Sequence, residues 1–242
     1  MALVKKFLRI MAYSGGLLIV IGIIAAAVDP DFYTWLTARF TNHTVKSRLD
    51  IYEQKIDSQL IPIFTEKKVS YPPTKVKLVF FKDETVLKLY AGHSQDKVTL
   101  IKSYPVEAAS GIAGPKLREG DRQVPEGIYR VESLNPNSRF HLSLRVNYPN
   151  SFDQEMAALD QRTQVGSDIM IHGSNVSIGC IAIGNEAIEE LFVLAAKTNY
   201  QNWELILAPT DLLKNPRPNS ENLPKWINDL DNKIKIALKE LR

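Results

Sequence analysis

The sequence predicts a mainly β fold with helices, in which a sandwich or barrel-like core carries one packed helix and is flanked by further helices. Short apolar segments separated by Gly and Pro turns follow one another between residues 75 and 210. Apolar residues at helical spacing precede this region and follow it. The 242 residues are 45% hydrophobic and 24% charged, which excludes a disordered chain and a polytopic membrane protein.

The N-terminal residues 1–28 form either a membrane anchor or a signal peptide. Lys5, Lys6 and Arg9 precede an uncharged run over residues 10–28, which as a helix would be about 28 Å long and close to the thickness of a bilayer. The basic flank should stay in the cytoplasm. We therefore expect an exported, periplasmic or otherwise extracytoplasmic protein, anchored to the inner membrane by residues 10–28. Cleavage after the small residues 25–27 is the alternative.

A helical connecting segment is expected over residues 29–74. Val45, Leu49, Tyr52, Ile56 and Leu60 recur every three or four positions, which predicts an amphipathic helix that Pro62 ends. We expect this helix to pack on the following domain or to space it from the membrane.

Strands are expected across the next region, with a hairpin turn at residues 82–84. The segment 139–146 alternates, with Phe140, Leu142, Leu144 and Val146 on one face and Arg139, His141, Ser143 and Arg145 on the other. The expected strands cover residues 76–81, 85–90, 98–104, 128–134, 139–146, 169–172, 178–183 and 203–207.

Two helices complete the prediction. The first has Asn185 as its N-cap and buries Ile188, Leu191, Phe192 and Ala195. The second occupies the C-terminal segment 211–242 and is expected to pack on the domain. Its apolar stripe consists of Trp226, Ile227, Leu230, Ile234, Leu238 and Leu241.

Composition excludes several kinds of function. A formal net charge of +3 without a basic cluster gives no support to nucleic-acid binding. The single cysteine, Cys180, excludes an intramolecular disulfide and a four-thiolate zinc site. The histidines His43, His93 and His141 are scattered, so no metal is expected, and no G-x-S-x-G serine elbow occurs.

Cys180 and His172 are the candidate nucleophile and base. Two adjacent strand ends joined by a glycine-containing loop could bring a thiol and an imidazole together, and an imidazole can activate a thiol. The backbone N–H groups of Gly179 and Cys180 could form an oxyanion hole. A cysteine buried in a core strand 178–183 also explains this spacing, and the spacing alone favours that interpretation slightly and leaves both open.

Several ordered motifs between residues 75 and 209 resemble the L,D-transpeptidase catalytic domain family (YkuD-type), and more closely its YafK-like murein branch. The motifs are Ile171-His172-Gly173, Ser177-x-Gly179-Cys180, Gly120-Asp121-x-x-Val124-Pro125-Glu126-Gly127-x-Tyr129, the run 135–143 and Tyr148-Pro149-Asn150. The resemblance implies an L,D-transpeptidase-like β-sandwich or barrel over residues 75–210. It further implies peptidoglycan stem peptides containing diaminopimelate as partners, and no cofactor.

The resemblance also implies roles for the site residues. Cys180 would be the nucleophile that forms a thioester, and His172 would take and return its proton. A backbone carbonyl near Gly173 would orient the imidazole. A second amine or water would resolve the acyl-enzyme, so acyl transfer and hydrolysis of murein or protein–murein links are both implied. The non-enzymatic alternative is a wall-binding module in which the thiol is merely buried.

Two departures from the larger branch of the family leave the acyl acceptor open. Ile178 replaces a second histidine, and Ala182 replaces an arginine. The remaining candidates for binding substrate carboxylates are Arg139, His141 and Arg145, for which a solvated strand face is the alternative. The oligomeric state is not predicted.

Overall fold

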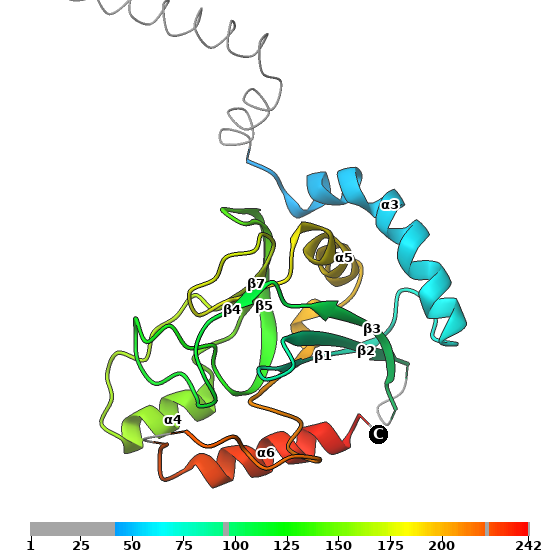
Figure 1. Cartoon of the computed structure of the whole chain (residues 1–242). Coiled ribbons are helices and arrows are strands. Elements are labelled where there is room, and N and C mark those ends of the chain that lie inside the picture. The colour runs from blue at the N-terminus through cyan, green and yellow to red at the C-terminus, as the bar shows by residue number, and fades with distance from the viewer. Residues whose placement is uncertain (1–41, 94–96, 221–222, 242) are drawn as a thin grey trace, which may run out of the picture. The chain divides into compact units, whose positions relative to one another are not determined.

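The computed structural model describes residues 42–93, 97–220 and 223–241 (Figure 1). Contacts divide the chain into Met1–His43 and Thr44–Arg242, and the second unit contains all the elements below. The expected apolar span 10–28 lies outside the described residues. Within the described ranges, none of the helices combines the length and the apolar character that crossing a bilayer requires.

Nine strands form one mixed sheet in the described part of the chain, in the order β3-β2-β1-β9-β5-β6-β7-β8-β4. The pairs β1–β9 and β7–β8 are parallel, and the other pairs are antiparallel. The strands are β1 (Lys75–Phe81), β2 (Val86–Gly92), β3 (Thr99–Pro105), β4 (Ala108–Ala109), β5 (Gly127–Ser138), β6 (His141–Val146), β7 (Met170–His172), β8 (Ile181–Ala182) and β9 (Glu204–Ala208).

The long strand β5 lets the sheet fold back on itself. Its first residues, 127–130, pair with β9, and residues 131–138 pair with β6. At the two ends of the strand order, β3 and β4 are separated by only Val106 and Glu107, which bond to the carbonyls of Thr85 and Ala182. The sheet is therefore curved almost into a closed barrel, which confirms the expected mainly β core with helices.

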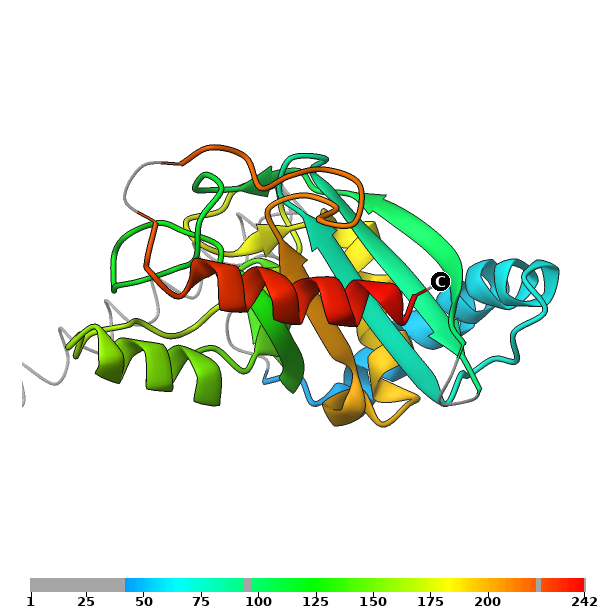
Figure 2. The same cartoon turned by 90° about the horizontal axis from the view of Figure 1, so that it is seen from below.

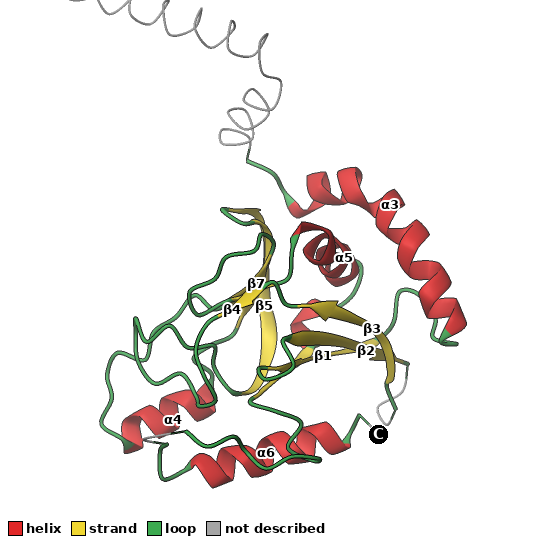
Figure 3. Cartoon of the chain, in the orientation of Figure 1, coloured by secondary structure: helices red, strands yellow, loops and turns green. Residues whose placement is uncertain are grey.

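Helices cover both sides of this sheet (Figure 3). On one side, α5 (Asn185–Ala196) buries the four predicted residues against the strands, and α3 (Val45–Glu66) packs on α5 through Ile56, Leu60 and Phe64. The expectation that the first helix packs on the domain is confirmed. Ion pairs at 3.1 Å between Lys55 and Glu189 and at 2.5 Å between Lys197 and Asp57 join the two helices at their edges.

On the opposite side, α6 (Ile227–Lys239) lies across the sheet (Figure 2). Its predicted stripe packs Trp226, Leu230, Ile234 and Leu238 on a patch of β1 and β9 formed by Val79, Phe81, Ile206 and Ala208. Because β1 is covered on both faces, its residues are buried in an almost continuous run instead of alternating.

Four predicted details were wrong. The first helix continues past Pro62 to Glu66, because burial of Phe64 in the core outweighs the hydrogen bond that proline removes. The N-cap of α5 is Gly184, and the Asn185 side chain instead accepts a hydrogen bond from the backbone N–H of Ser174. Ile178 is 75% exposed, so the predicted strand 178–183 is reduced to Ile181–Ala182.

The fourth correction concerns the segment 139–146. The chain turns at Arg139 and Phe140, and His141 has a left-handed backbone (φ +76°) before β6 begins its regular course. Ser143 is as buried as Leu142 and Leu144 because both faces of β6 are covered. The helix α4 (Ser151–Leu159), whose Phe152 contacts Trp226 at the start of α6, was not predicted.

Candidate active site

His172 is fixed in a buried position at the end of β7. Its Nδ1 atom lies 2.6 Å from the carbonyl oxygen of Gly173, and its ring stacks on Phe140 with 4.6 Å between centroids. Gly173 has no room for a side chain, since a Cβ there would lie 2.6 Å from Asn185 Oδ1 and 2.7 Å from Phe140 O. The imidazole is therefore held from one edge and one face.

The other ring nitrogen, Nε2, is buried and has no hydrogen-bond partner among the described residues. Buried polar atoms are rarely left in this state, because the lost hydration costs about 1–3 kcal/mol. An unpartnered nitrogen on an otherwise fixed ring is suited to exchanging a proton with a bound reactant.

Cys180 immediately precedes β8, and extending the β7–β8 register back by one residue aligns it with Met170, on the same face of the sheet as His172. His172 pairs with Ala182 and Ile171 with Ile181, so Cys180 lies two positions before the partner of His172 on the neighbouring strand. Side chains two positions apart share a face, and strand spacing puts the two Cα atoms about 8 Å apart. At this separation, a reactant that lies between the two side chains can contact both the thiol and the imidazole.

No hydrogen bond joins the thiol of Cys180 to the imidazole of His172 among the described residues. The Cys180 thiol donates to the carbonyl oxygen of Asp168 at 3.6 Å. Burial raises the pKa of Cys180, and a backbone hydrogen bond from Met170 opposes this shift. Burial also lowers the pKa of His172, opposed by the bond to Gly173. Both shifts favour a neutral thiol and a neutral imidazole over a preformed thiolate–imidazolium pair.

The two N–H groups expected to form an oxyanion hole are engaged by serine hydroxyls. Gly179 N–H donates to Ser110 Oγ at 2.6 Å, and Cys180 N–H donates to Ser177 Oγ at 3.0 Å. Gly179 has a left-handed backbone (φ +91°), which explains why glycine precedes the cysteine. These N–H groups can bind an oxyanion only where a substrate oxygen replaces the hydroxyls.

The three basic candidates for substrate binding do not converge. Arg139 is exposed in the β5–β6 turn, and His141 turns toward the helices, with Nε2 2.9 Å from Glu189 and its ring against Tyr52. Arg145 bridges Glu132 and Asp168 at 2.8 Å each and lines a polar cavity of about 780 Å³. Because Asp168 also accepts the thiol's hydrogen bond, Arg145 is the one of the three that borders the site.

Sequence reasoning missed Phe140, Asp168 and Ser110. Phe140 was placed on a strand face with Leu142 and Leu144, whereas it lies in a turn, is 37% exposed and stacks on His172. Ser110 lies 69 positions from Gly179 and carries no motif of its own. Ser177 did carry a signal, because it belongs to the Ser-x-Gly-Cys motif. Among the described residues, no group of three or more His, Cys, Asp or Glu side chains is arranged to hold a metal.

Residues 76–230 match the model of the YkuD L,D-transpeptidase catalytic domain. The match covers more than half of the chain, which therefore belongs to this family, as its motifs predicted. These residues thus form an L,D-transpeptidase-type catalytic domain.

Similar proteins include "Putative L,D-transpeptidase YafK" of Escherichia coli (strain K12), 36% identical over 137 residues, which are 56% of this chain and 53% of that protein. The chain thus spans about half the length of this relative. Among solved structures, the helical cell shape determining protein Pgp2 of Campylobacter jejuni aligns with a TM-score of 0.45 at 22% identity, over 58% of this chain and 50% of that one. Bd1075 of Bdellovibrio bacteriovorus aligns with a TM-score of 0.43 at 18% identity, over 70% and 56%.

Proposed function

We propose that the chain is a cysteine acyltransferase that acts on peptidoglycan stem peptides containing diaminopimelate. The observation that carries the proposal is the buried, unpartnered Nε2 of His172, on the same sheet face as the thiol of Cys180. Membership of the L,D-transpeptidase family supports the substrate class.

In the first step, a donor carbonyl binds between the two side chains. The thiol proton passes to His172 Nε2 while sulfur bonds to the carbonyl carbon, so thiolate forms only as the tetrahedral intermediate forms. The carbonyl oxygen displaces the hydroxyl of Ser177 and accepts a hydrogen bond from the backbone N–H group of Cys180, while the N–H group of Gly179 stays bonded to Ser110. The C–N bond then breaks, and His172 returns the proton to the departing amine.

In the second step, an amine attacks the Cys180 thioester, His172 takes the proton of the amine and passes it to the departing sulfur, and the thiol is regenerated as the new amide forms.

The polar cavity beside Arg145 supports a peptide substrate, because an extended peptide with a free carboxylate could lie there near the guanidinium. Arg145 is already paired with Glu132 and Asp168, so such binding exchanges one carboxylate for another.

The domain organisation is part of the proposal. Residues 75–210 form the catalytic domain, 29–74 connect it to an N-terminal anchor or signal peptide at 1–28, and 211–242 supply a helix that stabilises the sheet. The catalytic domain would act outside the cytoplasm, where its substrate lies.

Product analysis tests the activity. The purified full chain is incubated with diaminopimelate tetrapeptide muropeptides with and without added amine acceptor, and products are resolved by mass. Cross-linked dimers or acceptor conjugates support acyl transfer. Release of a peptide or amino acid without conjugates shows a hydrolase of the same fold instead. If the unaltered chain forms no product at all, an enzymatic function on this substrate is refuted, and the wall-binding module is the interpretation that remains.

His172→Ala is the matched variant. We expect its kcat/KM to fall by about 10²–10⁴, because general acid–base catalysis contributes on that order. His141→Ala is the control, since its imidazole pairs with Glu189 on the helix side and should leave kcat/KM within a few-fold.

A further inference from the structure

The loop between β4 and β5, here called the arch (residues 110–126), contains no helix or strand and is held together by side-chain hydrogen bonds. Asp121 accepts four hydrogen bonds, from Lys116 Nζ at 2.6 Å and from the backbone N–H groups of Leu117, Arg118 and Gln123 at 2.8–3.1 Å. Burial raises the pKa of Asp121, but these bonds outweigh it and hold the pKa below its ordinary value. Gln123 Oε1 closes the arch by accepting from Ile112 N–H at 3.0 Å.

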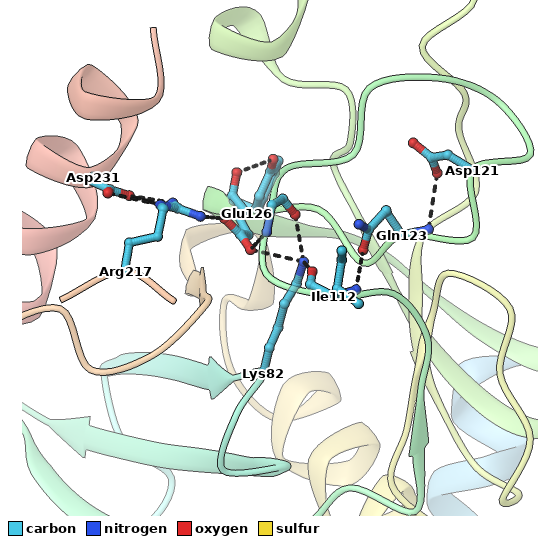
Figure 4. A network of polar contacts seen from close by, with 9 residues as sticks. Lys82, Ile112, Asp121, Gln123, Glu126, Arg217 and Asp231 are labelled. Atoms are coloured by element: carbon cyan, nitrogen blue, oxygen red, sulfur yellow. Dashed lines mark hydrogen bonds and ion pairs between the residues drawn. The ribbon is translucent and has the colours of Figure 1, made fainter. Parts of the chain in front are cut away.

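A buried charge cluster fixes one end of the arch to the rest of the fold (Figure 4). The carboxylate of Glu126 is fully buried and contacts Lys82 at 3.1 Å and Arg217 at 2.7 Å, while it accepts Gly114 N–H at 2.7 Å. Arg217 in turn binds Asp231 of α6. Lys82 Nζ also donates to the carbonyls of Ile112 and Gly114 at 3.1 and 2.8 Å.

The other end of the arch rests on the turn that carries the nucleophile. The Ser110 hydroxyl donates to the carbonyl of Arg122 at 2.8 Å and accepts the N–H of Gly179 at 2.6 Å. The carbonyl of Gln123 lies 3.6 Å from the position a Cβ on Gly179 would take. Through these two hydrogen bonds Ser110 links the rest of the arch to Gly179, the left-handed residue before Cys180.

We propose that Ser110 is a positioning residue for the nucleophile: its hydroxyl holds the Gly179–Cys180 turn against the arch and thereby sets the exposure and aim of the thiol. Only the kinetic consequence rests on the proposed acyl transfer. The hydrogen bonds themselves act on the turn whether or not a substrate is bound. Glycine at 179 makes the link necessary, because its backbone is the least restrained of any residue.

The test compares Ser110→Ala with Ser110→Thr, which keeps the hydroxyl, and with Ser103→Ala, which removes an exposed serine from β3. The first measurement needs no substrate: the rate of Cys180 alkylation by iodoacetamide in the full chain at fixed pH. We expect the rate in Ser110→Ala to rise at least threefold, because the released turn exposes a thiol that is now half-buried. Ser110→Thr and Ser103→Ala should stay within twofold of the unaltered protein.

The second measurement is turnover of tetrapeptide muropeptides. Loss of one hydrogen bond that aims the nucleophile should lower kcat about tenfold in Ser110→Ala with KM unchanged within twofold, and threonine should restore kcat. An unchanged or slower alkylation rate in Ser110→Ala, or failure of threonine to restore it, overturns the inference. If the unaltered protein is alkylated but turns over no muropeptide, the proposed function fails while the alkylation series still decides the role of Ser110.

Discussion

Replacing Arg217 by methionine tests how strongly the buried charge cluster stabilises the fold. Arg217 is 9% exposed and its guanidinium joins two carboxylates, those of Glu126 at 2.7 Å and Asp231 at 2.9 Å. Removing one partner of a buried ion pair leaves a charge without compensation, at a cost of about 3–5 kcal/mol. Because Lys82 still contacts Glu126, we expect a loss of about 3 kcal/mol in the free energy of unfolding.

Urea unfolding at pH 7 measures this loss. Adding Asp231→Asn to Arg217→Met should recover at least about 1 kcal/mol, since Asp231 loses its guanidinium partner in Arg217→Met whereas Glu126 keeps Lys82. The exposed i,i+4 pair of Lys46 and Asp50 is the control, and Lys46→Met should change stability by no more than experimental error. A loss below about 1 kcal/mol in Arg217→Met, or no recovery in the double variant, would refute this view of the cluster.

Three further predictions follow from individual contacts. Burial raises the pKa of Asp153 from 3.8 to about 6, so its ionised form destabilises the fold by up to about 3 kcal/mol above pH 6, and this penalty disappears as the pH falls toward 4. In urea titrations, Asp153→Asn should therefore gain stability relative to the unaltered protein between pH 4 and 8; a difference independent of pH contradicts this. Gly179→Ala should lose about 1–2 kcal/mol in thermal unfolding, because its backbone is left-handed, whereas unchanged stability would show that the turn relaxes. Ile234→Ala should lower the free energy of unfolding by about 2–5 kcal/mol, because it leaves a cavity under α6. The alkylation rate of Cys180 should stay the same in this variant, and a changed rate would show that the core under α6 is coupled to the site.

Local patterns predicted much of the fold because apolar residues recur along most of its strands and helices at the spacing typical of that element. The hairpin at residues 82–84 and the stripe of α6 were read directly from that period. By contrast, α4 buries only Ala157 completely, so its apolar signal was too weak to detect. Its one clear mark was the pair Asn150 and Asp153, which form a capping box.

The site was predictable only where its residues are close in the chain. His172 and Cys180 share a motif and lie on neighbouring strands. Ser110 meets Gly179 because the sheet closes and brings β4 beside β8, a contact that no local pattern contains. The placement of Arg139 and Phe140 on a regular strand was also wrong, because the chain turns at these two residues and His141 has a left-handed backbone before β6 continues.

The central claim is that Cys180 carries the acyl group. Intact-mass measurement of the full chain, quenched in acid shortly after mixing with a diaminopimelate tetrapeptide muropeptide, tests it most directly. We predict an added mass equal to the donor less its departing residue, located on Cys180, released by hydroxylamine and absent from Cys180→Ala. Product formation without an adduct, at a rate unchanged in Cys180→Ala, would contradict the account.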